Sequence, residues 1–373
     1  MANRLRMFTK RFFIYANLLV VALFLLSCLI PLLHPKSWWW VSLMGLTFPF
    51  LLLLVICFLF GWLLLLKFRL TLISIVALVL GYQSIAVFIA FNAPSEFSAQ
   101  KKKGSIRVVS WNVARFIELA RNNNPGSITR KKMLQLLREQ KADILCLQEF
   151  YTSDNPGYYN NIQTIREQLG FRHVYFPYDK DGDRNYYSSV IFSRFPIVDT
   201  AMLRYPRPSQ PEVLLQADID IGTDTLRVYT THLQSQRFDK KDYQRMEKIK
   251  SREDSILINS IPILGKLKRG MVIRSEQADI IAAVRNNSPH PVVLAADLND
   301  VPNSYTYFKV RGPLKDAFLE KGYGLGRTFR GLSPTLRIDY IFSDPRFSVL
   351  QVKRERKDYS DHYLLVADLQ VRP

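Results

Sequence analysis

Cysteine is scarce throughout this sequence, and acidic side chains are nearly missing from its first hundred residues. Three cysteines occur among 373 residues: Cys28 and Cys57 stand in apolar runs, and Cys146 stands alone in the later part. A disulfide framework and a cysteine-based zinc site are therefore excluded. Residues 1–100 hold seven basic residues and one acidic residue, Glu96, so 44 of the 51 basic and 31 of the 32 acidic residues belong to 101–373. The chain thus has a charge-poor region and a region of net charge +13, and its 48% hydrophobic content excludes a disordered protein.

Charged residues are also missing from three long stretches near the N-terminus, which cover 12–35, 37–66 and 70–95. Each stretch is longer than the ~20 residues that a helix needs to cross a bilayer. Helices of globular proteins keep a polar face, and the run 51–60 has none. We predict a membrane region at 1–95 with three transmembrane helices at about 12–33, 40–66 and 70–92. Because no charged residue lies inside these helices, they are expected to anchor the chain in the lipid bilayer rather than to transport ions.

Basic residues are more numerous before the first predicted helix than after it. Four basic residues precede it, namely Arg4, Arg6, Lys10 and Arg11, and one, Lys36, follows it. Lys67 and Arg69 separate the second predicted helix from the third. By the positive-inside rule the N-terminus faces the cytoplasm, and three crossings place the later residues on the far side of the plasma (inner) membrane. The run 101–103 (KKK) weakly favours the opposite side. Residues 25–28 (LLSC) also resemble a lipoprotein processing site at Cys28, but we prefer an ordinary Ser-Cys pair inside a helix.

The charged region begins after a small, polar linker at 96–105 and is read as one domain at 106–373. Apolar runs of strand length recur in it, at 106–110, 144–147, 190–192, 213–219, 226–231, 292–295, 338–342, 347–352 and 364–369. Helical patterns lie between some of them, at 129–140, 162–169, 240–259 and 273–285. Strands and helices do not alternate strictly, so we predict an α/β domain with mixed sheets.

Polar residues gather where these predicted strands end. The segments are 110–112 (SWN), 147–149 (LQE), 230–233 (TTHL), 296–299 (ADLN), 337–340 (RIDY) and 359–362 (YSDH). Each is weak evidence alone, because Asp-X-Asn and Ser-Asp-His are common in turns. Together, Glu149, Asp361 and Asn112 offer the hard oxygen ligands that Mg²⁺ prefers, with Mn²⁺ as an alternative. The remaining set, Asp297, Asn299, Asp339, His232 and His362, could activate water and bind phosphate.

The order of these motifs, together with Ser-Arg-Phe-Pro-Ile at 193–197, resembles the endonuclease/exonuclease/phosphatase superfamily over about residues 105–373. The resemblance implies a four-layer α/β sandwich, with two mixed β-sheets face to face and helices outside. It also implies a role for each matching residue. Glu149 would be the principal Mg²⁺ ligand, with Asn112 and Asp361 nearby. Asp297 and Asn299 would orient and deprotonate the attacking water. His362, paired with Asp339, would bind the scissile phosphate, and His232 would donate to a phosphate oxygen or help the leaving group.

Three departures from the family pattern bear on substrate. Ala114 stands where apurinic endonucleases have a carboxylate, so abasic-site repair is not supported. Residues 187–190 (YSSV) replace the usual glycine-bearing approach to a strand. A basic segment also separates His232 from Asp297, with 11 basic and 5 acidic residues in 235–275. A solvated helix surface explains this basic segment as well as a binding surface does. A binding surface would contact either nucleic acid or, through the apolar run 256–264, a membrane surface.

The sequence therefore predicts a membrane-anchored, Mg²⁺-dependent phosphoesterase that hydrolyses phosphate esters by in-line attack of water. Phosphodiesters, either nucleic acid or a phospholipid headgroup, are favoured over phosphomonoesters because a tether and a basic surface suit large anionic or lipid substrates. The alternatives are an inositol-phosphate type of phosphomonoesterase and a tethered module that binds phosphorylated ligands without turnover. No protein partner is evident from the sequence.

Overall fold

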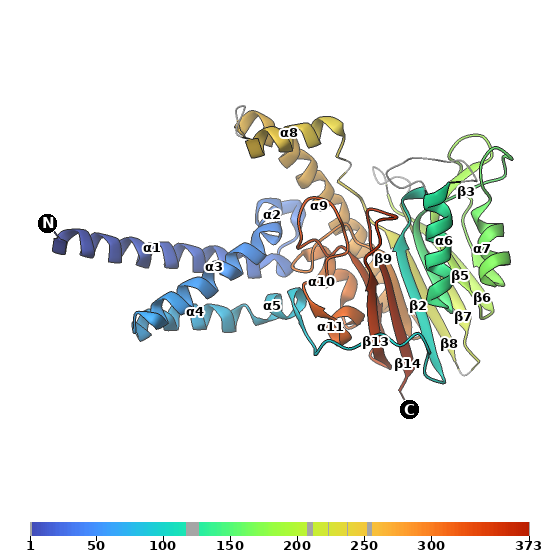
Figure 1. The fold of residues 1–373 in the computed structure, drawn as a ribbon, viewed down its shortest axis with the longest axis horizontal. Coiled ribbons are helices and arrows are strands. Elements are labelled where there is room, and N and C mark those ends of the chain that lie inside the picture. Colours follow the sequence, from blue (N-terminus) through green and yellow to red (C-terminus); the bar gives the residue numbers. More distant parts are fainter. Residues whose placement is uncertain are drawn as a thin grey trace. The chain divides into compact units, whose positions relative to one another are not determined.

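The computed structural model describes residues 2–116, 127–206, 212–222, 224–236, 238–251 and 256–372 (Figure 1). The chain forms two compact units that interleave along the sequence. The first consists of Met1–Phe88, Arg237–Ser275 and Val301–Phe308, and the second of Ile89–Gln236, Glu276–Asp300 and Lys309–Pro373. The linear order of the sequence therefore differs from the grouping of the residues in space.

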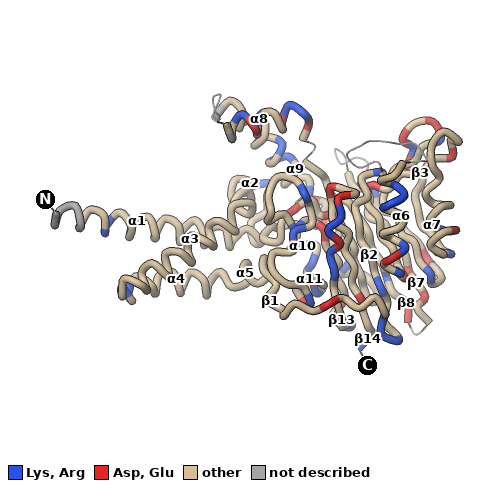
Figure 2. The backbone as a smooth tube through the Cα atoms, viewed as in Figure 1, with Lys and Arg blue, Asp and Glu red and all other residues tan. Residues whose placement is uncertain are grey.

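The first unit is helical. Its helices are α1 (Ala2–Cys28), a 3-10 turn (Ile30–Leu32), α2 (Pro35–Ser42), α3 (Met44–Leu64), α4 (Phe68–Leu80), α5 (Tyr82–Phe88), α8 (Lys240–Ser251) and the first part of α9 (Ile256–Asn286). Two stretches, Met7–Leu32 and Pro35–Leu64, are long and apolar enough to cross a membrane. Helices α4 and α5 would make a third span only as one broken helix, bent by 65°. Figure 2 shows how few charges α1 and α3 to α5 carry.

Glycine allows the bend between α4 and α5 to lie against α1. A Cβ atom at Gly81 would lie 2.6 Å from the ring of Phe24, which is closer than side chains approach one another. The buried side chains of Ser74 in α4 and Asn17 in α1 also form a hydrogen bond of 3.4 Å. Small residues and paired polar groups at such a crossing are typical of helices that pack within a bilayer.

Later parts of the chain contact the connection between the two long apolar helices. The Asn303 side-chain amide donates to the carbonyl of Ser27 at 3.0 Å, and the rings of Tyr305 and His34 lie 4.9 Å apart. The Lys268 ammonium lies 5.0 Å from the centre of the Trp39 ring. These contacts join α9 and residues 301–308 to the N-terminal helices within the first unit.

The second unit contains two six-stranded sheets and a short third one. Sheet I has the order β13-β14-β2-β3-β5-β4, sheet II has the order β10-β12-β9-β8-β7-β6, and β1 pairs with β11. Sheet I is formed by β2 (Ser105–Asn112), β3 (Ile144–Ser153), β4 (His173–Tyr175), β5 (Asn185–Ser193), β13 (Phe347–Glu355) and β14 (Leu364–Val371). Sheet II is formed by β6 (Ile197–Arg204), β7 (Val213–Asp220), β8 (Thr225–His232), β9 (Val292–Asp297), β10 (Lys315–Asp316) and β12 (Asp339–Ser343). The short pair is β1 (Ala90–Phe91) and β11 (Tyr323–Gly324).

Each large sheet has one parallel pair at its centre and antiparallel neighbours on both sides. The parallel pairs are β2 with β3 in sheet I and β8 with β9 in sheet II. A core of small and β-branched side chains joins the inner faces of the two sheets, and Val108, Cys146, Val228 and Ala295 belong to it. A second core lies between the outer face of sheet I and helices α6 (Ile128–Gln140) and α7 (Asn161–Leu169). The remaining helices are α10 (Tyr305–Arg311) and α11 (Ala317–Lys321).

This architecture confirms the predicted fold class, two mixed sheets with flanking helices preceded by apolar helices. All nine predicted strand runs form strands. The helical pattern predicted at 240–259 corresponds to α8 and the start of α9, with residues 252–255 outside the described part of the chain.

Candidate active site

The candidate site lies where the two central parallel pairs end. Asn112 is the last residue of β2, and Glu149 follows its register partner Gln148 in β3. His232 and Asp297 are the last residues of β8 and β9 and are paired with each other in register. Because parallel strands deliver their carboxyl ends to the same edge of a sheet, functional groups from four strands converge there.

A bulge in β3 determines the direction of the Glu149 side chain. The pairing of β3 with β5 shifts register between Leu147 and Phe150, and Glu149 has φ of 49°. A bulge commonly redirects one side chain out of the alternating pattern of a strand. The neighbouring Leu147 and Phe150 side chains remain buried in the outer core, while the Glu149 side chain stays 30% exposed.

The Asn112 amide links the two halves of the site. It donates to Glu149 Oε1 at 3.2 Å and to Asp297 Oδ2 at 3.0 Å. Its own oxygen accepts from the backbone N–H of Ala114 at 3.1 Å. One amide from sheet I therefore holds a carboxylate of each sheet, which fixes the spacing between the partly exposed Glu149 and the buried Asp297.

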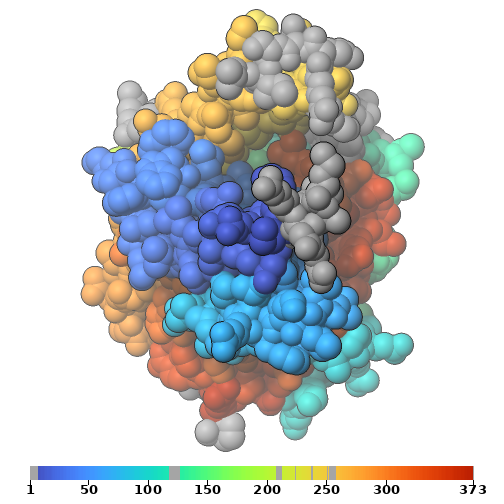
Figure 3. Space-filling view, turned by 90° about the vertical axis from the view of Figure 1, so that its left-hand side faces the viewer, coloured from blue at the N-terminus to red at the C-terminus, as the bar shows by residue number. Residues whose placement is uncertain are grey.

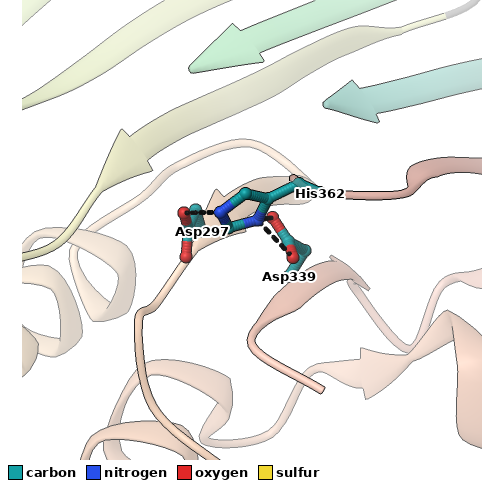
Figure 4. Close-up of side chains that lie close together, drawn as sticks. All are labelled: Asp297, Asp339 and His362. Carbon is teal, nitrogen blue, oxygen red and sulfur yellow. Dashed lines mark hydrogen bonds and ion pairs between the residues drawn. The ribbon is translucent and has the colours of Figure 1, made fainter. Parts of the chain in front are cut away.

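His362 lies between two buried carboxylates (Figure 4). Its Nδ1 is 3.0 Å from both carboxylate oxygens of Asp339, and its Nε2 is 3.7 Å from Asp297 Oδ2. Asp339 opens β12 and pairs in register with Asp297, so the sheet itself sets the separation of the two carboxylates. Trp111 fixes the backbone next to the imidazole by donating from Nε1 to the His362 carbonyl at 2.9 Å.

The charges of this cluster favour a protonated His362. Burial lowers the pKa of the imidazole, but the adjacent Asp339 and Asp297 carboxylates outweigh that effect and raise it well above 6.5. Burial raises the pKa of Asp339, while the charge of His362 lowers it. One proton satisfies both groups, and the second carboxylate at Asp297 favours its residence on the imidazole. The two carboxylates therefore favour the protonated form of His362.

His232 and Asn299 form the other side of the site. The Asn299 amide nitrogen lies 2.9 Å from His232 Nε2 and also donates to the Leu233 carbonyl at 2.9 Å. Asn299 has φ of 51°, and its N–H donates to Asp297 Oδ1 at 2.9 Å. His232 Nε2 lies 3.6 Å from Asp297 and 3.7 Å from Glu149. His232 thus stands between the buried and the partly exposed carboxylates.

Asp361 is near the site but is joined to it indirectly. Ser360 Oγ lies 3.2 Å from Asp361 Oδ1 and donates to the Asn112 carbonyl at 2.8 Å. Among the residues that the structure describes, no hydrogen bond joins the Asp361 carboxylate to Glu149 or to the Asn112 side chain. The structure therefore brings seven of the eight predicted residues into one contact network and leaves Asp361 at its edge.

Two groups of side chains could hold a divalent cation. Asp297, Asp339 and His362 have ligand atoms within 4.8 Å of one another. In that group His362 Nδ1 lies 3.0 Å from the Asp339 carboxylate, so Nε2, which faces Asp297, is the ring nitrogen left for a cation. Glu149 lines a small pocket with Tyr187 and His232, and its carboxylate accepts a hydrogen bond from the Asn112 amide. A carboxylate and an amide fit the preferences of Mg²⁺ once the Asn112 amide turns its oxygen from the Ala114 N–H towards Glu149.

Two residues beside Glu149 were missed or only partly recognised from the sequence. Arg115 stacks on Tyr187 with 4.2 Å between guanidinium and ring centre, and it forms an ion pair of 2.6 Å with Asp181. Arg115 has φ of 61° in a run of left-handed residues that follows Asn112. Burial and the charge of Glu149 raise the pKa of Tyr187 well above 10. Only its position three residues after Asn112 could have drawn attention to Arg115.

Phe329 was also missed. Its ring meets the His362 ring edge to face at 5.0 Å, and the two residues form an isolated β-bridge. The next residue, Arg330, donates its backbone N–H to the Asp361 carbonyl at 2.8 Å. The loop before β12 therefore lines the site beside His362, although its sequence at 325–336 carries no recognisable motif.

Comparisons with known proteins bear on the family and the fold. A model of the endonuclease/exonuclease/phosphatase family matches residues 109–362, and a model described only as a domain of unknown function matches residues 10–88. No curated protein matches the sequence.

Several solved structures share the fold. An endonuclease/exonuclease/phosphatase from Beutenbergia cavernae is 22% identical, with a TM-score of 0.53 and coverage of 72% of each chain. A humanized D. rerio TDP2 is 18% identical, with a TM-score of 0.51, covering 72% of this chain and 100% of its own. D. rerio TDP2 complexed with a single-strand DNA product is 16% identical, with a TM-score of 0.50 and the same coverage.

Proposed function

Because this chain belongs to the endonuclease/exonuclease/phosphatase family and is accordingly a phosphate-ester hydrolase, we propose that it is a membrane-anchored, Mg²⁺-dependent phosphodiesterase. We assign the chemistry to residues 106–373, joined through 96–105 to a membrane region at 1–95. The observation that carries the proposal is the buried His362 imidazole held between Asp339 and Asp297. The Asn112 amide joins Asp297 to the partly exposed Glu149. An imidazole whose protonated form is favoured by adjacent carboxylates suits a phosphate ester and its attacking water.

We assign His362 to the scissile phosphate and Asp339 to holding its proton and orientation. A protonated imidazole donates a hydrogen bond to a non-bridging oxygen, and that bond strengthens as charge develops in the transition state. His232, which is held by Asn299, would donate to a second phosphate oxygen or to the leaving group. Phe329 supports the face of the His362 ring and limits its rotation.

We assign Asp297 to the attacking water. Its carboxylate accepts hydrogen bonds from Asn112 and from the N–H of Asn299, which leaves few directions for a water to approach. The side chain is fully buried, so a water reaching it must displace a neighbour. His232 is the imidazole nearest both Asp297 and Glu149. Binding of substrate phosphate to His232 would therefore open the approach to Asp297.

We assign Glu149, Asn112 and Asp361 to Mg²⁺. When bound there, the ion would neutralise charge on a phosphate oxygen and lower the pKa of a coordinated water. The chain itself sets the spacing of the metal-ligand atoms, through the Asn112 amide and the bulge at Glu149.

Membrane anchoring is supported by the two long apolar helices. The contacts of Lys268 with Trp39 and of Tyr305 with His34 put later residues of the chain at the connection between these helices. If the first helix starts on the cytoplasmic side, the connection between the two long apolar helices faces outward. The later residues can then contact this connection only if the bent pair α4–α5 crosses the membrane as a third span. We therefore propose an extracytoplasmic catalytic domain in the plasma (inner) membrane.

A phosphodiester substrate is favoured, and nucleic acid is the first class to test. One structure with the same fold holds a single-strand DNA product, and the region after residue 100 has a net charge of +13 (44 basic minus 31 acidic). A phospholipid headgroup is the second candidate, because the proposed anchor would hold the site next to lipid. A phosphomonoester substrate and a non-catalytic binding module remain the competing hypotheses.

The test is turnover by the full chain in detergent with Mg²⁺, using DNA, RNA, phospholipids and inositol phosphates in parallel. Glu149→Gln and His362→Ala should each abolish cleavage of the preferred class. Glu320→Gln is the matched control, because Glu320 is an exposed glutamate on α11. No cleavage of any class by a folded protein that binds Mg²⁺ would reject the hydrolase mechanism for these substrates and favour the binding module.

A further inference from the structure

Helix α9 exposes apolar side chains over the first turns of its described part. Ile258, Ile261 and Leu264 are 72%, 67% and 40% exposed. Steps of three residues keep them on one side of the helix, and the exposed Lys268 and Arg269 continue that side in the next turns. Exposed apolar side chains followed by cationic ones are typical of helices that lie in the headgroup region of a membrane.

Helix α9 packs against the rest of its unit through side chains other than the exposed ones. Ile263, Met271 and Ile273 are buried. Helix α9 thus packs through a separate set of apolar side chains. Ile258 and Ile261 keep most of their surface exposed in the described chain, where a soluble helix would carry polar residues.

Trp39 fixes the depth of this surface relative to a bilayer. It lies in α2, at the beginning of the apolar stretch Pro35–Leu64, between the exposed Trp38 and Trp40. Tryptophans at the end of a span mark the membrane interface. Because Lys268 contacts the Trp39 ring, Lys268 lies at that same interface. Ile261 precedes Lys268 by seven residues, or about 10 Å along a helix, so it stays within reach of the headgroups.

The charge of the segment complements an anionic surface. Residues 237–275 contain 11 basic and 5 acidic residues. Two of the acids, Asp239 and Asp242, are already paired with Lys266. Figure 3 shows α8 and the first part of α9, yellow to orange, on the open surface beside the blue helices of the same unit.

We propose that the first part of α9, residues 258–269, forms an interfacial element. It inserts Ile258, Ile261 and Leu264 among the headgroups of anionic lipids, with Lys268 and Arg269 binding lipid phosphates. The inference rests on the membrane anchoring in the proposed function but not on its chemistry. It makes the bilayer surface itself a partner of the helical segment between His232 and Asp297.

The experiment places an environment-sensitive fluorophore on cysteine at Ile261 in the full chain carrying Cys28→Ala and Cys57→Ala; the remaining Cys146 is fully buried. The protein is reconstituted in liposomes of phosphatidylcholine alone or mixed with phosphatidylglycerol. Brominated lipids report contact with the bilayer, and aqueous iodide reports exposure to water. Ile258→Cys provides a second position. Val198→Cys is the control for an apolar residue, 60% exposed on β6, and Leu53→Cys, 58% exposed on α3, is the control for the anchor.

Brominated lipid should quench the probe at 261 and 258 but not at 198, with about twofold stronger quenching when phosphatidylglycerol is present. Lys268→Gln with Arg269→Gln should remove that dependence on anionic lipid while leaving the probe at 53 unchanged. Quenching at 261 by iodide alone would overturn the proposal, and shielding from both quenchers would overturn it in favour of a protein contact. Quenching at 53 shows in either case whether the anchor itself spans the bilayer.

Discussion

At the scale of single residues, the proton on His362 depends on the Asp339 carboxylate. Asn at position 339 keeps the size of the side chain but removes the charge that raises the pKa of the imidazole. We expect Asp339→Asn to lower kcat by about 10²- to 10⁴-fold, the usual range for losing an oriented proton donor, with little change in KM. Steady-state kinetics on the preferred substrate measure kcat and KM separately. Equal loss of activity through KM alone would contradict the role given to the pair.

Glu149 carries the second prediction at this scale, on metal dependence. Chelation with EDTA should abolish turnover of the wild-type protein, and added Mg²⁺ should restore it, because Glu149 and Asn112 provide hard oxygen ligands. Isothermal titration with Mg²⁺ should show binding that Glu149→Gln weakens by about tenfold or more. Asp339→Asn is the control and should leave Mg²⁺ binding intact. Weakening by Asp339→Asn but not by Glu149→Gln would move the ion to the Asp297–Asp339–His362 group.

Cys146 carries a prediction on pH. Burial raises the pKa of its thiol to about 12, whereas the unfolded chain ionises near 9. The unfolded state therefore loses this proton first as pH rises, and the free energy of unfolding falls by up to about 1.4 kcal/mol per pH unit above 9. Cys146→Ala should remove this part of the alkaline destabilisation. Iodoacetamide at pH 9, followed by peptide mapping, should modify Cys146 only in unfolded protein; rapid modification of the native protein would contradict the burial.

Residue types and their order pointed to residues that the structure brings together in the candidate site, but not to their contacts. Asn112, Glu149, His232 and Asp297 could be predicted because each ends a recognisable apolar run. Arg115 and Phe329 could not, since neither residue type nor spacing indicates a stack on Tyr187 or on His362. Their positions depend on left-handed backbone and on a loop, which the apolar pattern of a sequence does not encode.

At the scale of elements, a buried ion pair joins β2 to β14. Arg107 and Asp368 are register partners, both are 1% exposed, and their two contacts measure 2.6 Å and 2.8 Å. We expect Arg107→Met to reduce the free energy of unfolding by about 3–5 kcal/mol, because it leaves the Asp368 charge buried without its partner. The double variant with Asp368→Leu should recover most of that loss.

Unfolding of the full chain in detergent, followed by near-UV circular dichroism, measures these changes. Arg346→Met is the matched control, because Arg346 pairs with Asp344 while 58% exposed, and it should change stability by less than about 1 kcal/mol. A double variant no more stable than Arg107→Met alone would show that the pair is required for packing and not only for charge balance.

Burial explains which elements the sequence could predict. Eight of the nine predicted strands are largely buried, and their apolar runs are visible without a structure; the ninth, β13, is an edge strand that buries only Phe347 and Val349. Strand β6 was missed because it lies at the edge of sheet II and six of its eight residues are exposed. The bulge at Glu149 was also invisible, since it depends on pairing with β5 rather than on local sequence.

At the scale of the whole molecule, the sequence order suggested a membrane region followed by a separate domain. By contacts, residues 237–275 and 301–308 group with the N-terminal helices, so the two compact units interleave along the chain. Linear composition could not predict this grouping, since it depends on contacts such as Asn303 with Ser27 and Lys268 with Trp39. The same contacts lead to a prediction about the number of membrane crossings.

Three crossings place Lys36 on the same side of the membrane as the catalytic residues and Lys67 on the other side. Both lysines are exposed, and each adjoins the end of a long apolar helix. In the background of Cys28→Ala and Cys57→Ala, an impermeant maleimide should label Lys36→Cys together with Val198→Cys on intact vesicles of one orientation. Lys67→Cys should react only after permeabilisation. Labelling of all three from one side would mean that α3 does not cross. If Lys67→Cys is labelled together with Val198→Cys but Lys36→Cys is not, α4–α5 turns back within the membrane. The contacts of Lys268 and Tyr305 with the α1–α2 connection would then have to be absent in the bilayer.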